Sequence, residues 1–498
     1  MRSIMQPTRR DFLHLSTHTG AALLLPAAWS WGQAPADPPQ PASPFLRGNF
    51  APVREEVVAE NLRIIGRLPA GLEGMYVRNG PNPQFPPRGN YHWFDGDGML
   101  HGVRIAGGRA SYRNRYIRTA GFEEERRAGR ALYNGLADPP DLARIIAGQN
   151  PNKNVANTAL IRHNGRLLAL WEGGEPHEIR TPGLETVGPH TFGGQLRHPF
   201  TAHPKIDPAT GEMLCFGYQP VRPFVRFSTI NARGEIVRTV PVDIPRPVMM
   251  HDFAITQRFA VFMDLPETFD LARMLRRESP LVFRPEHGAR FGLVPRQADG
   301  GPVRWFDSQV CFVFHTLAAW EEDDAVVLIA CRYREFPDEI NGGPANPNAR
   351  PNQPVLYRWR FDLRTGRTSE SALDDLPVEF PRIHEARMAQ PIRYGYTAVV
   401  GGEMFTGYRK YDLQRGQHAT HQLGAGRFGG EAVFVPRPDA RAEDDGWLVA
   451  MVHDVAEGRA ELIVLDARDL AAQPLARILL PVRVPYGFHG IWIDGAQL

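Results

Sequence analysis

Trp447-Leu448-Val449-Ala450-Met451-Val452 and Ala460-Glu461-Leu462-Ile463-Val464-Leu465 are two short apolar runs near the end of the chain. Runs of this length, bounded by turn-forming residues, are typical of β-strands rather than helices. Turn sequences such as Asn164-Gly165 and Arg364-Thr365-Gly366 separate further runs of the same kind. The further strand-like runs lie after Val57 and include 110–117, 167–171, 325–330 and 396–400. The sequence therefore predicts an all-β fold.

Length and composition favour one repeated β architecture. The chain has 498 residues with 48 glycines and 45 prolines, which interrupt helices and populate tight turns. Length alone suggests about three domains. Many short strands in a chain of this size nevertheless favour a propeller over a single sandwich or small barrel. No strict repeat is visible, so the number of blades does not follow from the sequence.

Charge and cysteine content exclude other classes of protein. A formal net charge of +2 leaves no basic excess to neutralise a phosphate backbone, so we expect no nucleic-acid partner. The three cysteines, Cys215, Cys311 and Cys331, cannot make a disulfide framework, and none belongs to a CxxC pair. We therefore expect core burial to hold the fold together, and nothing in the sequence implies an obligate protein partner.

The first 36 residues have the features of an export signal. Thr8-Arg9-Arg10-Asp11-Phe12-Leu13 resembles a twin-arginine signal, and the apolar stretch 21–28 follows it. That stretch is shorter than the roughly 20 residues that cross a bilayer. We expect a signal over 1–36, cleaved between Trp29 and Ala36, and hence a periplasmic protein whose single folded domain covers 45–498.

Two segments have helical patterns. Asp138 to Ala147 carries a capping aspartate and prolines in its first turn. Glu267 to Arg277 is rich in apolar residues and ends in two arginines. The second segment predicts either a helix packed on the propeller or part of an apolar cap or membrane-touching surface, and the sequence does not separate these.

Histidines are the candidate metal ligands. A lone histidine in a strand is usually a hydrogen-bonded core residue. Widely spaced histidines could, however, each come from a different blade and meet on a central axis, where imidazoles suit iron, zinc, copper or nickel. Spacing alone does not select among the six histidines that lie in or beside strand-like runs, which are His101, His203, His251, His315, His453 and His489.

An ordered set of motifs resembles the carotenoid cleavage oxygenase family, which also contains lignostilbene dioxygenases and the retinal pigment epithelium isomerase. The set covers nearly the whole chain after the signal, and its specificity lies in the order rather than in any one fragment. The motifs are Met75-Tyr76-Val77-Arg78-Asn79-Gly80-Pro81-Asn82-Pro83, residues 92–102, 202–208, 249–253 and 312–315, Glu379-Phe380-Pro381-Arg382-Ile383, residues 430–437 and Gly487-Phe488-His489-Gly490.

The resemblance implies a seven-bladed β-propeller with a non-haem Fe²⁺ on its axis and a helical or loop cap over a substrate tunnel. By the motifs, the iron ligands are His203, His251, His315 and His489, and three glutamates hydrogen-bonded to three of these imidazoles are Glu172, Glu379 and Glu431. This set is chemically coherent, because four neutral imidazoles leave the Fe²⁺ charge uncompensated. A carboxylate behind an imidazole offsets that charge and fixes the tautomer.

The activity implied is cleavage of a C=C bond by O2 to give two carbonyl products, with no organic cofactor. Gly424-Ala425-Gly426-Arg427-Phe428-Gly429 matches a dinucleotide-binding pattern by letter, but a strand-like run follows it instead of a helix, so we interpret it as a turn. Lignostilbene-cleaving relatives typically place a lysine and a tyrosine on the phenol, where this chain has Trp171 and Leu136. Such an apolar pair favours an apolar carotenoid or apocarotenoid. Further candidate tunnel residues are Phe314 and Phe488.

Several alternatives stay open at this point. A stilbene dioxygenase and an isomerase acting without O2 lie within the same family. A calcium-dependent propeller lactonase or a non-enzymatic periplasmic binding protein lies outside it. A membrane that supplies the polyene is compatible with the sequence, although the near-zero net charge gives it no electrostatic support.

Overall fold

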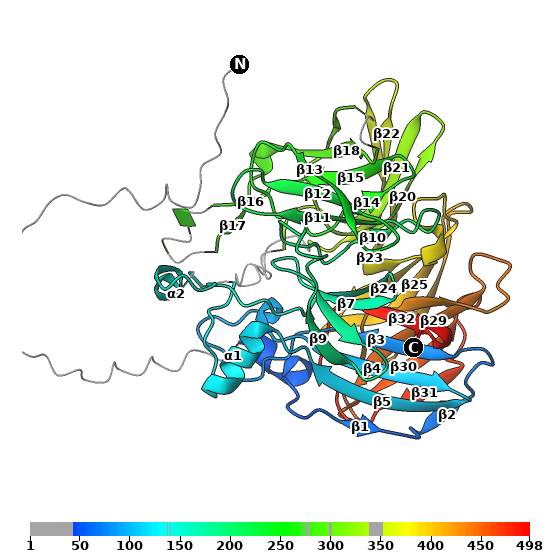
Figure 1. Ribbon diagram of the computed structural model, residues 1–498. Helices are drawn as coiled ribbons and strands as arrows, with labels where there is room; N and C mark the ends of the chain where they lie inside the picture. Colours follow the sequence, from blue (N-terminus) through cyan, green and yellow to red (C-terminus); the bar gives the residue numbers. More distant parts are fainter. Residues whose placement is uncertain are drawn as a thin grey trace, which may run out of the picture. The chain divides into compact units, whose positions relative to one another are not determined.

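The computed structural model describes residues 43–136, 138–139, 141–270, 272–273, 276, 279–297, 301–337 and 352–498. Ser43–Leu498 form one compact unit, and the export signal expected over 1–36 lies outside the described residues. Most of the regular structure is antiparallel β-sheet (Figure 1), which confirms the all-β prediction.

Three separate sheets of four strands occupy the middle of the chain. In each of them neighbouring strands pair antiparallel, and tight turns such as Asn164-Gly165 join several of the pairs. Their strands are β6 (Ala159–His163), β7 (Arg166–Leu170), β8 (His177–Arg180) and β9 (Glu185–Pro189); β10 (Lys205–Ile206), β11 (Met213–Tyr218), β12 (Val225–Ile230) and β13 (Ile236–Val242); and β14 (Ala254–Ile255), β15 (Phe259–Asp264), β18 (Ala289–Pro295) and β19 (Arg304–Ser308).

A larger, continuous sheet follows, and one long strand, β23 (Thr368–Arg382), joins its parts. The first part of β23 pairs with β22, whereas Val378, Glu379 and Arg382 pair with β24, with a register shift between Glu379 and Arg382. The other strands of this sheet are β20 (Phe312–Glu322), β21 (Ala325–Tyr333), β22 (Val355–Asp362), β24 (Tyr394–Gly401), β25 (Met404–Asp412), β26 (Gln417–Gln422), β27 (Arg427–Gly429), β28 (Val433–Pro436), β29 (Gly446–Asp454), β30 (Arg459–Asp466), β31 (Ala476–Leu479) and β2 (Ile64–Gly66).

The last sheet joins the two ends of the described chain. Strand β32 (Gly490–Asp494) pairs antiparallel with β3 (Gly74–Arg78), so the red and blue strands lie side by side in Figure 1. Its remaining strands are β4 (Met99–Ala106), β5 (Arg109–Tyr116) and β1 (Val58–Ala59). This pairing of the latest strand with an early one closes the succession of sheets.

The first strands of successive sheets contact one another. Contacts join β14 with β20, β20 with β23, β28 with β32, and β32 with β6. The three four-stranded sheets, the parts of the large sheet before β23, from β23 to β27 and from β28 on, and the last sheet are successive antiparallel units, and β16 pairs separately with β17. This arrangement of blades around an axis is that of a propeller.

Apolar side chains that alternate along the strands fill the space between neighbouring units. Strand β22 shows the pattern, since Trp359 and Phe361 are fully buried against Phe291 and Phe306 of the unit before. The three cysteines are free, in line with the expectation of no disulfide framework, and all three are buried. Burial between sheets, rather than cross-linking, therefore stabilises the fold.

The helical predictions have different outcomes. Helix α2 (Leu142–Ile146) confirms the first in a shorter form, because Asp141 caps it by accepting from the backbone of Ala143 and Arg144. The second prediction is wrong at its start. Glu267–Phe269 form strand β16, which pairs with β17 (Leu281–Phe283). A three-residue run of this kind carries no periodicity to tell strand from helix, and the partner strand lies beyond the predicted segment.

Much of the rest of that predicted helix, including Leu271, Met274 and Leu275, lies outside the described residues. A second helix, α1 (Ala120–Ala128), was not predicted, and Thr119 caps it. Among the described residues, no helix combines the length and the apolar character needed to cross a membrane.

Candidate metal centre

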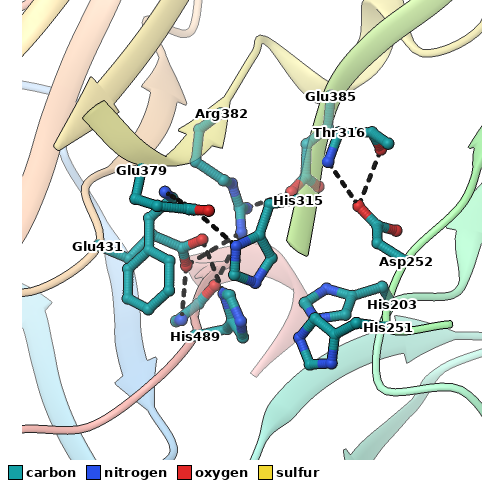
Figure 2. A network of polar contacts seen from close by, with 12 residues as sticks. His203, His251, Asp252, His315, Thr316, Glu379, Arg382, Glu385, Glu431 and His489 are labelled. Carbon is teal, nitrogen blue, oxygen red and sulfur yellow. Dashed lines mark hydrogen bonds and ion pairs between the residues drawn. The ribbon is translucent and has the colours of Figure 1, made fainter. Parts of the chain in front are cut away.

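Four histidines from four different units meet at the innermost strands. His203, His251 and His489 directly precede or lie close before β10, β14 and β32, and His315 lies within β20. One ligand nitrogen from each lies within 4.8 Å of all the others, and Figure 2 shows the imidazoles together. The Nε2 atoms of His203 and His251 are 2.9 Å apart. The structure thus brings together the four histidines predicted as ligands.

Other histidines in strand-like runs are placed elsewhere. His101 is buried in β4, and its Nδ1 lies 2.8 Å from the hydroxyl of Tyr112. His453 lies in β29 beside Tyr486. Neither belongs to the cluster, so geometry makes the selection that spacing could not.

Three of the four imidazoles are held by the three predicted glutamates. Glu172 Oε2 lies 2.6 Å from Nδ1 of His251. The corresponding distances are 2.6 Å from Glu379 Oε2 to His315 and 3.0 Å from Glu431 Oε1 to His489 (Figure 2 shows the last two). A carboxylate on Nδ1 places the proton there, so the lone pair on Nε2 faces the centre.

The electrostatics of the cluster suit a cation. Burial and the three neighbouring imidazoles hold the pKa of His203 well below its usual range, so this ring is neutral. The buried Nε2 of His315 has no hydrogen-bond partner among the described residues. An orphaned buried acceptor is costly unless something binds it. Four imidazole nitrogens, with carboxylates behind three of the rings, therefore fit a divalent metal with open coordination positions, and imidazole donors suit Fe²⁺.

Arg382 is a member of this site that sequence reasoning missed. Its Nη1 lies 3.2 Å from Glu431 Oε2, which also accepts the backbone N–H of Gly490 at 2.9 Å. Burial would raise the pKa of Glu431, but Arg382 and His489 hold it down, at about 2. The sequence did contain an indication of this role, because Arg382 lies in the same family motif, 379–383, as Glu379.

A second group of missed residues ties three ligand segments to one another. Asp252, next to His251, accepts hydrogen bonds at 2.8 Å from both the backbone N–H and the hydroxyl of Thr316. Its other oxygen lies 2.8 Å from Nζ of Lys205. Thr316 follows His315 and Lys205 lies just after His203, so Asp252 fixes three ligand segments relative to each other. No sequence motif marks this bracing role.

One cavity is lined by three of the clustered histidines, and a second lies beside Glu172. The first, which we call the histidine cavity, has a volume of about 330 Å³ and is lined by His203, His315 and His489 together with Lys205 and Arg382. The second, the tryptophan cavity, has a volume of about 430 Å³. It is lined by apolar and aromatic residues that include Trp171, Leu136, Phe94, Tyr218 and Phe269, and by Glu172 and Lys153.

The predicted tunnel residues divide between two places. Trp171 and Leu136 line the tryptophan cavity. Phe314 and Phe488 are not among the residues that line either cavity. Phe314 packs on the His251 ring with centroids 5.6 Å apart, and Phe488 packs on Trp93 at 4.5 Å. Side chains alternate along extended backbone, so the residue beside an inward-facing histidine points elsewhere.

Comparisons with known proteins agree with this geometry. The family model described as retinal pigment epithelial membrane protein matches residues 50–494. The chain is 40% identical to a carotenoid 9,10(9',10')-cleavage dioxygenase 1 of Arabidopsis thaliana, over 91% of this chain and 90% of that protein. It is 36% identical to a carotenoid cleavage oxygenase of Mycobacterium tuberculosis, over 90% of this chain and 97% of that protein.

Solved structures share the whole fold. A lignostilbene dioxygenase of Pseudomonas brassicacearum superposes with a TM-score of 0.83 at 32% identity, covering 91% of this chain and 99% of that one. The cobalt-substituted apocarotenoid oxygenase of Synechocystis gives 0.80 at 30% identity, covering 89% and 97%. With the four-histidine centre and a family match over nearly all of its described length, the chain belongs to the carotenoid cleavage oxygenase family.

Proposed function

We propose that this protein is a non-haem Fe²⁺ dioxygenase that cleaves one C=C bond of a carotenoid or apocarotenoid. The alkene and one O2 molecule would give two carbonyl products, each with one oxygen atom. The observation that carries the proposal is the four-histidine cluster with glutamates on three of its Nδ1 atoms. The match to carotenoid-cleaving relatives over about nine-tenths of both chains supports the substrate class.

The residues of the centre have two proposed roles, to hold the metal and to orient its ligands. His203, His251, His315 and His489 would hold the Fe²⁺, and Glu172, Glu379 and Glu431 would orient three of these rings. When bound, the metal would supply the electrons that activate O2 beside the alkene.

The tryptophan cavity is the proposed seat of the polyene. Aromatic and apolar side chains make up much of its lining and suit an apolar chain, while Asp95, Glu125 and Lys153 add charged groups to the wall. Glu172 brings the wall against the His251 side of the cluster. Binding there would fix one double bond near the metal, because a bound substrate reacts only at the bond it presents.

A stilbene substrate is the second candidate. The superposition on a lignostilbene dioxygenase supports it, and so does the presence of Lys153 in the wall of the tryptophan cavity, where a phenol could meet a cation. Lys153 already contacts Glu125 at 2.5 Å and Asp97, and these carboxylates offset its charge. The position next to Glu172 is Trp171 rather than lysine, so the carotenoid remains the preferred substrate.

The test combines metal and product analysis on protein purified without oxygen. We expect about one iron per chain, O2 uptake with a panel of carotenoids, apocarotenoids and stilbenes, and aldehydes identified by mass. Product formed under strict anaerobiosis would contradict the dioxygenase, and calcium in place of iron would point to another class of enzyme. The His251→Ala variant should lose iron and activity, while His453→Ala, outside the cluster, should keep both.

We further propose export to the periplasm and contact with a membrane that supplies substrate. The twin-arginine-like motif over 8–13 supports export. It would be tested by replacing Arg9 and Arg10 with lysine and following the protein by cell fractionation. Contact with a membrane is supported by helix α2, whose Leu142 and Ile146 side chains are 65% and 87% exposed. Exposed apolar side chains on a short helix can enter the headgroup region.

A further inference from the structure

The three glutamates of the metal centre have different partners besides their histidines. Glu431 accepts from Arg382 and from the backbone of Gly490. Glu379 Oε2, the oxygen that faces His315, also accepts the backbone N–H of Phe380 at 2.6 Å. Both glutamates are buried. Glu172 is the partly exposed member of the three and the one that lines the tryptophan cavity.

Glu172 is held by a side chain that no motif singled out. The hydroxyl of Tyr218, at the end of β11, donates to Glu172 Oε1 at 2.6 Å. The other oxygen of the same carboxylate accepts from His251 at 2.6 Å. A chain of two short hydrogen bonds therefore leads from the Tyr218 hydroxyl to the His251 ring.

Packing fixes the Tyr218 ring in place. Its centroid lies 6.4 Å from that of Phe216 in a stacked arrangement, and 6.0 Å from that of Phe269. One side of the residue also lines the tryptophan cavity, beside Trp171 and Glu172. The ring thus belongs to the cavity wall, while its hydroxyl belongs to the support of the metal centre.

The phenol has a specific effect on the carboxylate. Without the phenol, Oε1 of Glu172 would lose this hydrogen bond at the wall of the tryptophan cavity, and the carboxylate could rotate about its terminal bond toward other donors or water. A neutral donor prevents that rotation and leaves the negative charge available to His251. At Glu431, by contrast, Arg382 neutralises part of the charge.

We propose that Tyr218 is a positioning residue of the metal centre, which holds the Glu172 carboxylate and through it sets the orientation and basicity of His251. The inference rests on the proposed function in one respect, that the cluster binds Fe²⁺. It adds that one wall residue of the tryptophan cavity is coupled to a metal ligand. Replacing the hydroxyl should therefore act on the metal and on turnover rather than on substrate binding.

The test is Tyr218→Phe, which keeps the ring in the cavity wall and removes the hydroxyl. Support from behind a ligand is worth about 10–100-fold in metal affinity when the first partner is lost. Tyr218 is one hydrogen bond further from the metal than Glu172, so we expect Fe²⁺ affinity, measured in competition with a chelator, to fall by a smaller factor of about 3–10. The KM for the polyene should stay near the wild-type value, while kcat falls. The nitric oxide adduct of the Fe²⁺ protein should also give an altered electron paramagnetic resonance signal.

Tyr411→Phe is the matched control. Tyr411 is also a buried tyrosine whose hydroxyl donates to a carboxylate, Asp374, at 2.9 Å, but it lies outside the metal centre. It should lose a comparable amount of thermal stability and keep wild-type iron affinity and spectrum. The double variant Tyr218→Phe with Glu172→Gln should bind iron no more weakly than Glu172→Gln alone, because Tyr218 acts through Glu172.

The outcomes separate the two proposals. Iron affinity and spectrum of Tyr218→Phe equal to those of Tyr411→Phe would overturn the role of Tyr218. Effects of Tyr218→Phe and Glu172→Gln that simply add would also overturn it. If the wild-type protein binds Fe²⁺ but cleaves no polyene, the positioning role is still measured by affinity and spectrum, and only the assigned substrate fails. A wild-type protein that binds no Fe²⁺ overturns both.

Discussion

Glu172 and His251 form a hydrogen bond of 2.6 Å, although a whole blade separates them in the sequence. Glu172 follows β7 of one unit and His251 precedes β14 of the next but one, with the β10–β13 sheet between them in sequence. The metal centre is therefore supported between units as well as within them. A structural change in one blade should therefore alter the orientation of a metal ligand that another blade contributes.

Glu172→Gln should weaken iron binding while the protein remains folded. The amide can still accept from His251, but it supplies no charge, so the imidazole becomes a weaker donor to the metal. We expect iron affinity to fall about 10–100-fold. Glu178→Gln is the control, because Glu178 is exposed to a similar degree and pairs with Arg166 instead. Equal iron affinity in the two variants would contradict the role given to Glu172.

Glu431→Gln should damage folding as well as metal binding. It leaves the partly buried Arg382 with Glu385 as its carboxylate partner, so the cost should stay below the value of about 3–5 kcal/mol for breaking a buried pair. Urea unfolding of the metal-free protein measures this cost. In the double variant Arg382→Met with Glu431→Gln, we expect part of the stability to return but not the iron. Full recovery of iron would show that Glu431 serves only to neutralise Arg382.

Ile146→Glu should reduce binding to membranes without changing the chemistry. The side chain of Ile146 is 87% exposed on α2, so a charge there costs little in the folded protein and much in a headgroup region. Flotation with neutral vesicles should show less bound variant than wild type, while activity on detergent-dispersed substrate stays the same. Exposed Val237→Glu, on β13, is the control. Equal loss of flotation for both variants would argue against α2 as the contact.

Asp95 should make the stability of the protein depend on pH. Burial raises its pKa from 3.8 to about 6, above the value in the unfolded chain. A raised folded pKa gives a contribution that is fully present below the unfolded pKa and is lost as pH rises through about 6. At 1.36 kcal/mol per unit, the loss is at most about 3 kcal/mol.

Asp95→Asn should remove this dependence. Its amide oxygen can keep one of the two backbone hydrogen bonds, from His92 or Leu136, that the carboxylate accepts. Urea unfolding between pH 4.5 and 7.5 should therefore show a smaller decline for the variant than for wild type. Parallel stability profiles for the two proteins would mean that the carboxyl titrates normally.

Local patterns and the family motifs predicted the strands and the set of residues at the centre. The runs 325–330 and 460–465 are strands β21 and β30, since short apolar runs between turns have few alternatives. What escaped prediction depends on partners far away in sequence. Arg382 and Tyr218 matter because of what they face, and Glu267–Phe269 becomes a strand because Leu281–Phe283 pairs with it. A single sequence contains no direct record of such pairings.

The pairing of β32 with β3 sets an order of events for the metal centre. His489 directly precedes β32, so this ligand reaches its position when the end of the chain docks against a strand made early in synthesis. The other three clustered histidines come from segments synthesised earlier. Metal capture by all four is thus a signal of completed folding, and a chain stalled before its last strand would hold the metal with three ligands at most.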